Sequence, residues 1–251
     1  MITTNADGGL YHWHTTSGKM LHKIHDPYSQ LLTCDYKQDG LEFLTSGVEC
    51  EIKIYDEQTR QEKLSMKNGA DGQPGHSLRV FCCKFVKDDD NLIISGGWDK
   101  TIKIWDCRSG DIVRNICGPF VCGDAIDVWD GYILSGSYSD HNQLQMWEFS
   151  TGKFIEEISF QTAKEKAEQK TPCQIYSTQF QKSGGDLIVA GGAVCNEAKI
   201  FNGADYFQPA ATITDLSRGV YTTDFNNTGD MFALGGGDGV IRCFNIVGDM
   251  D

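Results

Sequence analysis

Six aromatic residues recur along this chain at nearly regular intervals, and this periodicity limits the possible folds more than any other feature. They are Trp13, Tyr55, Trp105, Trp147, Phe201 and Phe244. Their positions differ by 42, 50, 42, 54 and 43 residues, and each closes a short segment in which apolar and polar residues alternate. A repeat of this length indicates an array of similar strand-rich units, each packed on the next.

The sharpest copy of the repeat carries a short set of marker residues: Gly75-His76, Ser95, Asp99 and Trp105-Asp106. The Asp found six residues before Trp105 recurs in the first and last copies, as Asp7 and Asp238. A Gly-His near the start and a Trp-Asp at the end of a unit of about 40–45 residues are typical of a four-stranded propeller blade. On these residues the chain resembles the WD-repeat β-propeller family over nearly its whole length.

The resemblance implies an all-β fold, a β-propeller of four-stranded antiparallel blades. We expect one WD-repeat domain over 1–251 with six visible blades, spanning approximately 1–25, 26–67, 76–117, 118–160, 172–214 and 215–248. The first blade lacks its innermost strand and the last its outermost strand. This predicts that the chain is the C-terminal part of a longer, seven-bladed protein; the alternative is a six-bladed ring with two thin blades. An insert rich in Ala, Glu and Lys, 162–170, predicts one or two helical turns.

The charge and the cysteines restrict the class of protein. The 251 residues carry a net charge of −13, which argues against binding to nucleic acid or to an anionic membrane and favours a basic protein partner. The ten cysteines include no Cys-x-x-Cys pair, and the N-terminus lacks the charged start and apolar stretch of a signal peptide. We therefore expect reduced cysteines and a cytoplasmic protein, with nuclear or cytoskeletal association as the alternatives.

Four residues of the sharpest repeat match a structural tetrad of WD-repeat blades: His76, Ser95, Asp99 and Trp105. The resemblance implies that they join strands and loops by buried hydrogen bonds. A hydrolase would need an exposed nucleophile on a sharp turn, whereas Ser95 is expected within a strand. His12 and His14 share one face of a strand, but a zinc site needs three or four converging ligands. We therefore expect no catalytic residues, no metal and no cofactor.

The candidate partner-binding residues lie elsewhere. In WD-repeat propellers the turn between the second and third strands opens on the same face as the connections between blades. The sequence places six candidates there: Trp98, Arg79, Tyr138, Tyr176, Arg218 and Tyr221. Exposed Trp and Arg are frequent binding anchors, and two long inserts, 68–75 and 161–171, fall on the same face. The alternative is that these aromatic residues pack on neighbouring loops.

These features predict a non-catalytic protein–protein interaction scaffold, in which loops around a channel mouth bind a partner peptide or protein with a basic segment. The alternative is a structural subunit of a large assembly, cytoskeletal, ciliary or RNA-processing, that uses several faces. An enzyme would need acidic residues converging on the channel. The first strands supply Asp35, Asp127 and Asp224, which we expect to bond the backbone of a neighbouring blade.

Overall fold

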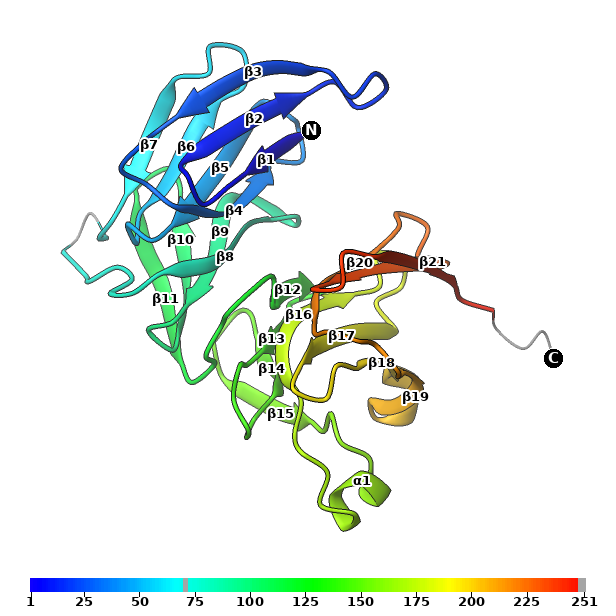
Figure 1. Cartoon of the computed structure of the whole chain (residues 1–251). Helices are drawn as coiled ribbons and strands as arrows, with labels where there is room; N and C mark the ends of the chain where they lie inside the picture. Colours follow the sequence, from blue (N-terminus) through cyan, green and yellow to red (C-terminus); the bar gives the residue numbers. More distant parts are fainter. Residues whose placement is uncertain (70–71, 248–251) are drawn as a thin grey trace. The chain divides into compact units, whose positions relative to one another are not determined.

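The computed structural model describes residues 1–69 and 72–247, and these form antiparallel sheets with very little helix (Figure 1). The strands form where buried apolar residues alternate with more exposed ones. In β6 (Ile52–Asp56), for example, Ile52 and Ile54 are buried whereas Lys53 between them is partly exposed. This period of two gives each strand one face that packs on the next sheet.

The chain divides into two compact units, and the first, Met1–Gly118, contains three sheets. The first sheet is β1 (Ile2–Thr4), β2 (Gly9–Trp13) and β3 (Met20–His25). The second is β4 (Leu31–Tyr36), β5 (Glu42–Gly47), β6 and β7 (Glu62–Met66). The third is β8 (Val80–Val86), β9 (Asp89–Gly97), β10 (Thr101–Asp106) and β11 (Asp111–Cys117). Strands adjacent in the chain pair with one another in each sheet.

The second unit, Pro119–Asp251, also contains three sheets. The first is β12 (Ile126–Trp129), β13 (Tyr132–Gly136), β14 (Leu144–Glu148) and β15 (Phe154–Ile158). The second is β16 (Gln174–Phe180), β17 (Leu187–Ala193), β18 (Ala198–Asn202) and β19 (Gln208–Ile213), with a 3-10 turn at Gly203–Asp205. The third is β20 (Val220–Phe225), β21 (Met231–Gly236) and β22 (Ile241–Asn245).

The expected all-β fold is therefore confirmed, down to the strand content of each sheet. Four sheets have four strands, and the first and last have three among the described residues, as the sequence predicts. Two expected segments extend beyond these residues: positions 70–71 of the insert 68–75, and position 248 at the end of the last blade, lie outside the part that the structure describes.

Within each unit the hydrophobic core lies between consecutive sheets. In the first unit, Trp105 is fully buried together with Leu44, Val80 and Ile93 from the second and third sheets. In the second unit the corresponding layer between β12–β15 and β16–β19 contains Leu134, Met146, Phe160, Ile175 and Phe201. Burial of each such side chain contributes about 1.5–3 kcal/mol, so packing between sheets is the main source of stability.

Polar side chains on the first strand of a sheet also join neighbouring sheets. Asp35 accepts a hydrogen bond from the backbone N–H of Phe85 at 2.9 Å, and Asp127 accepts one from that of Phe180 at 2.8 Å. These are the inter-sheet bonds expected from the sequence. Asp224 differs, because it forms an ion pair with Lys182 Nζ at 2.6 Å instead.

The one α-helix of the described residues is short and lies in the insert between the first two sheets of the second unit. It is α1 (Ala163–Ala167), and it begins with a capping box in which Thr162 Oγ1 accepts from the Glu165 backbone N–H while the Glu165 carboxylate accepts from that of Thr162. The cap satisfies two backbone donors that a helix start otherwise leaves free. No helix within residues 1–69 and 72–247 is long and apolar enough to cross a membrane.

Candidate functional site

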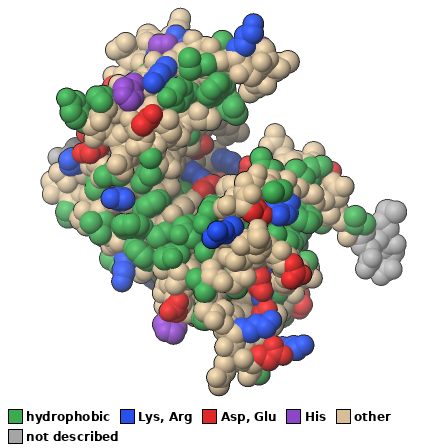
Figure 2. All heavy atoms as spheres, in the orientation of Figure 1, with side chains coloured by type: hydrophobic (Ala, Val, Ile, Leu, Met, Phe, Trp, Pro, Cys, Tyr) green, Lys and Arg blue, Asp and Glu red, His purple; other side chains and the backbone are tan. Residues whose placement is uncertain are grey.

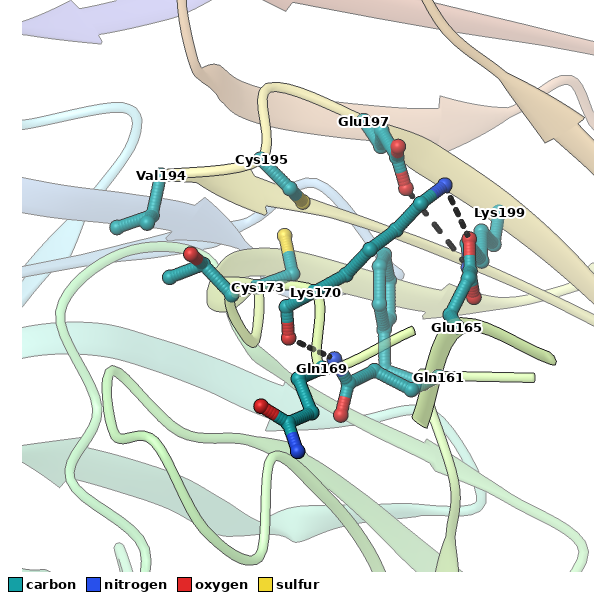
Figure 3. Close-up of a pocket in the computed structure, with 11 residues that line it drawn as sticks. Gln161, Glu165, Gln169, Lys170, Cys173, Val194, Cys195, Glu197 and Lys199 are labelled. Atoms are coloured by element: carbon teal, nitrogen blue, oxygen red, sulfur yellow. Dashed lines mark hydrogen bonds and ion pairs between the residues drawn. The ribbon is translucent and has the colours of Figure 1, made fainter. Parts of the chain in front are cut away.

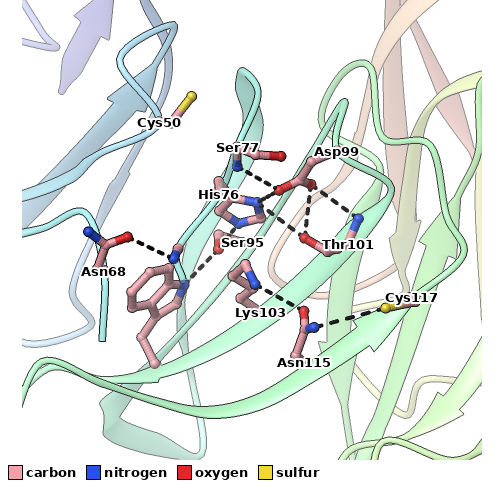
Figure 4. A network of polar contacts seen from close by, with 12 residues as sticks. Cys50, Asn68, His76, Ser77, Ser95, Asp99, Thr101, Lys103, Asn115 and Cys117 are labelled. Atoms are coloured by element: carbon pink, nitrogen blue, oxygen red, sulfur yellow. Dashed lines mark hydrogen bonds and ion pairs between the residues drawn. The ribbon is translucent and has the colours of Figure 1, made fainter. Parts of the chain in front are cut away.

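A buried polar network in the third sheet of the first unit joins four side chains (Figure 4). Trp105 Nε1 donates to Ser95 Oγ at 2.8 Å, and Ser95 Oγ lies 2.7 Å from His76 Nε2. His76 Nδ1 is in turn 2.8 Å from Asp99 Oδ2. The three side chains of His76, Ser95 and Trp105 are almost completely shielded from water.

Every proton in this network has an acceptor if the imidazole of His76 is neutral. Its Nδ1–H then donates to Asp99, and its Nε2 accepts from the Ser95 hydroxyl, which already accepts from Trp105. Partial burial raises the pKa of Asp99, but hydrogen bonds from His76, Thr101 and the Ser77 backbone outweigh it, so the pKa is lowered overall. The Ser95 hydroxyl is thus committed to structure and is buried away from any substrate.

The first strands contain a second recurring feature, a β-bulge close to their start. The pairing register of β8 with β9 shifts between Val80 and Cys82, which leaves Phe81 as an extra residue. The same shift occurs in three other sheets, and the extra residues there are Leu32, Tyr176 and Tyr221. A bulge bends the strand and redirects the extra side chain out of the regular alternation. Three of the four redirected side chains are aromatic.

The bulge requires a glycine on the partner strand. A Cβ added to Gly97 would lie only 2.0 Å from the carbonyl oxygen of Arg79, which accepts a hydrogen bond from the backbone N–H of Trp98 at 3.0 Å. Only glycine leaves room for such a close backbone approach. This explains the last glycines of β9 and β21, Gly97 and Gly236, since a Cβ on Gly236 would likewise lie 2.4 Å from the carbonyl oxygen of Gly219.

In the second unit these bulges assemble three of the predicted residues into what we call the tyrosine row: Tyr138, Tyr176 and Tyr221. The ring centroids of Tyr138 and Tyr176 are 5.0 Å apart, and those of Tyr176 and Tyr221 are 4.9 Å apart in an edge-on arrangement. Such contacts are favourable beyond the area that they bury. Tyr221 remains 47% exposed, so the row is held together by its own contacts and still presents a ring to solvent.

Arg218, also predicted, lies beside the exposed end of the tyrosine row. It is exposed, and it and Tyr221 flank Gly237, where an added Cβ would lie 3.3 Å from Arg218 Cβ and 3.0 Å from a ring carbon of Tyr221. At the other end of the row, Phe120 contacts Tyr138 with centroids 6.3 Å apart. Four of the six predicted residues thus form one cluster within the second unit.

The pKa of the Tyr176 phenol is a property of this cluster that can be measured. Burial, followed by the neighbouring Tyr138 phenol, raises the pKa of Tyr176 to about 12, whereas a tyrosine in an unfolded chain ionises near 10. Its contribution to stability is therefore complete below about pH 10 and is lost as the pH rises towards 12. We expect an ultraviolet titration to show one tyrosine fewer ionising near pH 12 in Tyr176→Phe than in the unmodified protein, and an unchanged titration curve would contradict this assignment.

The remaining two predicted residues, Arg79 and Trp98, form a separate group in the first unit. The Arg79 guanidinium lies 5.1 Å from the centroid of the Trp98 ring, and that ring stacks on Phe81 at 5.3 Å. Trp98 is therefore partly covered by its neighbours, while Arg79 is exposed. A cation over an indole face holds both side chains in place. This arrangement leaves a preformed patch of one cation and two rings.

Two residues of these clusters were not selected from the sequence. Phe81 and Phe120 support Trp98 and Tyr138, respectively. The signal for Phe81 was present, because it occupies the same position in its strand as Tyr176 and Tyr221 do in theirs. Phe120 lies before β12 in a connection without a repeat pattern, so alignment of the repeats carries no signal for it.

A profile described as "WD domain, G-beta repeat" matches residues 71–106. This segment contains the whole tetrad of His76, Ser95, Asp99 and Trp105, and the structure shows these side chains in one hydrogen-bonded network. The sheet formed by β8 to β11 therefore contains a WD repeat, and the chain as a whole is similar to WD-repeat proteins in its series of six antiparallel sheets.

Several known proteins match part of the chain. The guanine nucleotide-binding protein G(I)/G(S)/G(T) subunit beta-1 of Homarus americanus is 29% identical over 118 residues, 47% of this chain and 33% of that protein. The guanine nucleotide-binding protein subunit beta of Solanum tuberosum is 25% identical over 142 residues, 57% and 36% respectively. Autophagy-related protein 16 of Arabidopsis thaliana is 20% identical over 191 residues, 76% and 34%. The chain spans about a third of the length of each of these relatives.

Proposed function

We propose that this protein is a non-catalytic scaffold that binds a partner protein through the tyrosine row and Arg218. The observation that carries the proposal is the bulge-supported row of rings, in which Tyr221 is 47% exposed beside an exposed arginine. Rigid aromatic side chains next to Arg are the residues most enriched at the energetic centres of protein interfaces. Relatives described as G-protein beta subunits and as an autophagy-related protein support a role in protein interaction.

We propose no catalytic activity because the polar side chains that could serve as catalysts form hydrogen bonds within the protein. Ser95, His76 and Asp99 bond one another inside a sheet, and Asp35 and Asp127 bond the backbone of the next sheet. A catalytic acid, base or nucleophile must instead reach a substrate. These residues therefore stabilise the scaffold on which the binding loops are displayed.

The partner segment that we propose is basic. The net charge of −13 attracts positively charged chains over long distances, and such steering raises association rates more than affinity. Arg218 then serves as a hydrogen-bond donor to backbone carbonyl groups of the bound segment. A phosphopeptide would require a cluster of arginines, whereas the six arginines here are dispersed along the sequence. The proposed site of action is the cytoplasm.

Selection from a displayed random-peptide library tests the proposal directly. We expect enriched peptides to carry Lys or Arg next to an apolar residue, and Tyr221→Ala to weaken their binding by about 2 kcal/mol, or about 30-fold. The matched control is Tyr206→Ala in the same unit, because Tyr206 is 88% exposed and lies outside the row. Binding should also weaken as salt is increased.

Two other results would contradict the tyrosine row as the binding site of a basic peptide. If Tyr221→Ala binds as tightly as the unmodified protein while Trp98→Ala loses the peptide, the Arg79–Trp98 patch of the first unit is the binding site. If neither substitution matters and acidic peptides are enriched as often as basic ones, the basic-peptide scaffold is wrong, and a structural subunit with contacts on several faces becomes the better explanation.

A further inference from the structure

A pocket of about 440 Å³ lies in the second unit where the insert containing α1 meets β16 to β18 (Figure 3). Its lining comes from the insert, from the turn between β17 and β18 and from β18 itself, and includes Glu165, Lys170, Cys173, Cys195, Glu197 and Lys199. Figure 2 shows acidic and basic side chains mixed on the surface around α1. Two of the lining residues, Cys173 and Cys195, carry thiols.

The register of the sheet brings these two cysteines together. Gln174 of β16 pairs with Ala193 of β17, and Cys173 and Cys195 lie just beyond this last pair on either strand. The Cys173 thiol donates a hydrogen bond to the carbonyl oxygen of Ala193 at 3.5 Å, and Cys195 lines the same pocket beside it. In Figure 3 the two side chains point towards each other across the pocket wall.

The two thiols differ in exposure, and this assigns them different chemical roles. Cys173 is only 1% exposed, whereas Cys195 is partly exposed and faces the pocket. The neighbouring Cys173 thiol lowers the pKa of the Cys195 thiol, and the neighbouring Cys195 thiol together with burial raises the pKa of Cys173. The thiolate is the reactive form of cysteine, so Cys195 is the thiol that reacts first. Cys173 is the buried second thiol beside it.

We propose that Cys173 and Cys195 form a thiol–disulfide exchange site whose substrates are low-molecular-weight disulfides. The Cys195 thiolate attacks a disulfide RSSR and forms a mixed disulfide, Cys195–S–SR, with release of one thiolate RS⁻. The Cys173 thiol then loses its proton and attacks the Cys195 sulfur, which releases a second RS⁻ and leaves a Cys173–Cys195 disulfide. The protein loses two electrons and two protons, and the small disulfide is reduced to two thiols.

The new bond would fix the turn between β17 and β18 to the end of the insert. This turn contains two non-glycine residues with left-handed backbone, Val194 with φ of 77° and Asn196 with φ of 53°. A β-branched residue is rarely found in that region, so the turn is held there by its surroundings. The disulfide would cross-link the turn to residue 173 and thereby set the width of the pocket that Lys199 and Glu165 also line.

The site can be tested with oxidised glutathione and the complete, folded chain. After the reaction is stopped by acid, intact mass and peptide mapping should show loss of about 2 Da and a linkage between the peptides that contain Cys173 and Cys195. Cys173→Ser should stop at the mixed disulfide, with one glutathione on Cys195. The matched control is Cys243→Ser, which removes an exposed cysteine of the same unit and should leave the reaction unchanged.

Glutathione retained on Cys243 or Cys117 with Cys195 unmodified would overturn the proposal. It would also fail if the unmodified protein never forms the Cys173–Cys195 linkage even though Cys195 reacts. The map of the unmodified protein decides the question independently of the variants, so a variant that fails to fold does not leave the proposal untested.

Discussion

Ser95→Ala lowers the free energy of unfolding by about 2–6 kcal/mol, because it leaves two buried groups without a partner, each costing about 1–3 kcal/mol. The hydroxyl is the acceptor for Trp105 Nε1 at 2.8 Å and lies 2.7 Å from His76 Nε2. Both side chains are shielded from water, so water cannot replace the lost bonds. The midpoint and slope of urea unfolding, followed by tryptophan fluorescence, measure the change.

The first sheet of the second unit, β12 to β15, provides a matched control for this prediction. Ser135 is also fully buried and accepts from Trp147 Nε1 at 2.9 Å, but its own hydroxyl donates to the backbone carbonyl of Gln145 rather than to a histidine. Ser135→Ala therefore leaves one buried side-chain donor unpaired, and we expect a loss of about 1–3 kcal/mol. An equal or larger loss for Ser135→Ala would show that His76 adds nothing to the network of the third sheet.

Glu165→Gln destabilises the second unit by about 3 kcal/mol, because removing one partner of a buried ion pair leaves the other charge uncompensated. The Lys199 side chain is only 1% exposed, and its Nζ lies 2.6 Å from Glu165 Oε2 and 3.7 Å from Glu197 Oε2. The more distant Glu197 remains in the variant, which keeps the loss at the lower end of the range for buried pairs. Glutamine can still close the capping box with Thr162, so the substitution isolates the charge.

A second substitution shows whether the loss of stability in Glu165→Gln comes from the unpaired charge of Lys199 or from altered packing of the insert. In Glu165→Gln/Lys199→Met the buried cation is also gone, and we expect stability within about 1 kcal/mol of the unmodified protein. If the double variant is as unstable as the single one, the loss comes from packing of the insert rather than from the charge. Urea unfolding of the two variants and of Lys199→Met completes the cycle.

The ion pair of Glu165 and Lys199 also predicts that the stability of the protein decreases at acidic pH. Partial burial opposes ionisation of Glu165, but hydrogen bonds from Lys199 and Thr162 outweigh it and lower its pKa to about 2, compared with about 4.3 in an unfolded chain. Its stabilising effect is therefore present above about pH 4.3 and is lost as the pH falls towards 2. Glu165→Gln should lack this part of the acid transition.

The sequence predicts the sheets well because their signals are local. The spacing of Trp105 from Asp99 and Ser95 is set by one hairpin, and the alternation within β10 is visible in adjacent residues. The inter-sheet bonds of Asp35 and Asp127 are also predictable, since a carboxylate inside a buried strand needs a donor. Asp224 differs, since its carboxylate is largely exposed and forms an ion pair with Lys182.

The candidate sites were predicted only in part, because their geometry depends on register. Tyr176 and Tyr221 could be selected as first-strand aromatics, but nothing in the sequence around them marks the one-residue bulges that redirect them. Cys173 and Cys195 are 22 residues apart, a separation without any cysteine motif. Only the pairing of β16 with β17 places them side by side.

The bulges also allow a surface side chain to change without altering the pairing of the strand that carries it. A residue in the regular ladder must match its neighbours across the strand, so a change there alters the fit of the sheet. The extra residue of a bulge has no partner in the ladder, and the four sheets with a bulge already accept Leu32, Phe81, Tyr176 and Tyr221 at this position. Natural variation or engineering can therefore change the chemistry of this surface by substituting one residue per sheet, while the strands beneath keep their sequence and pairing.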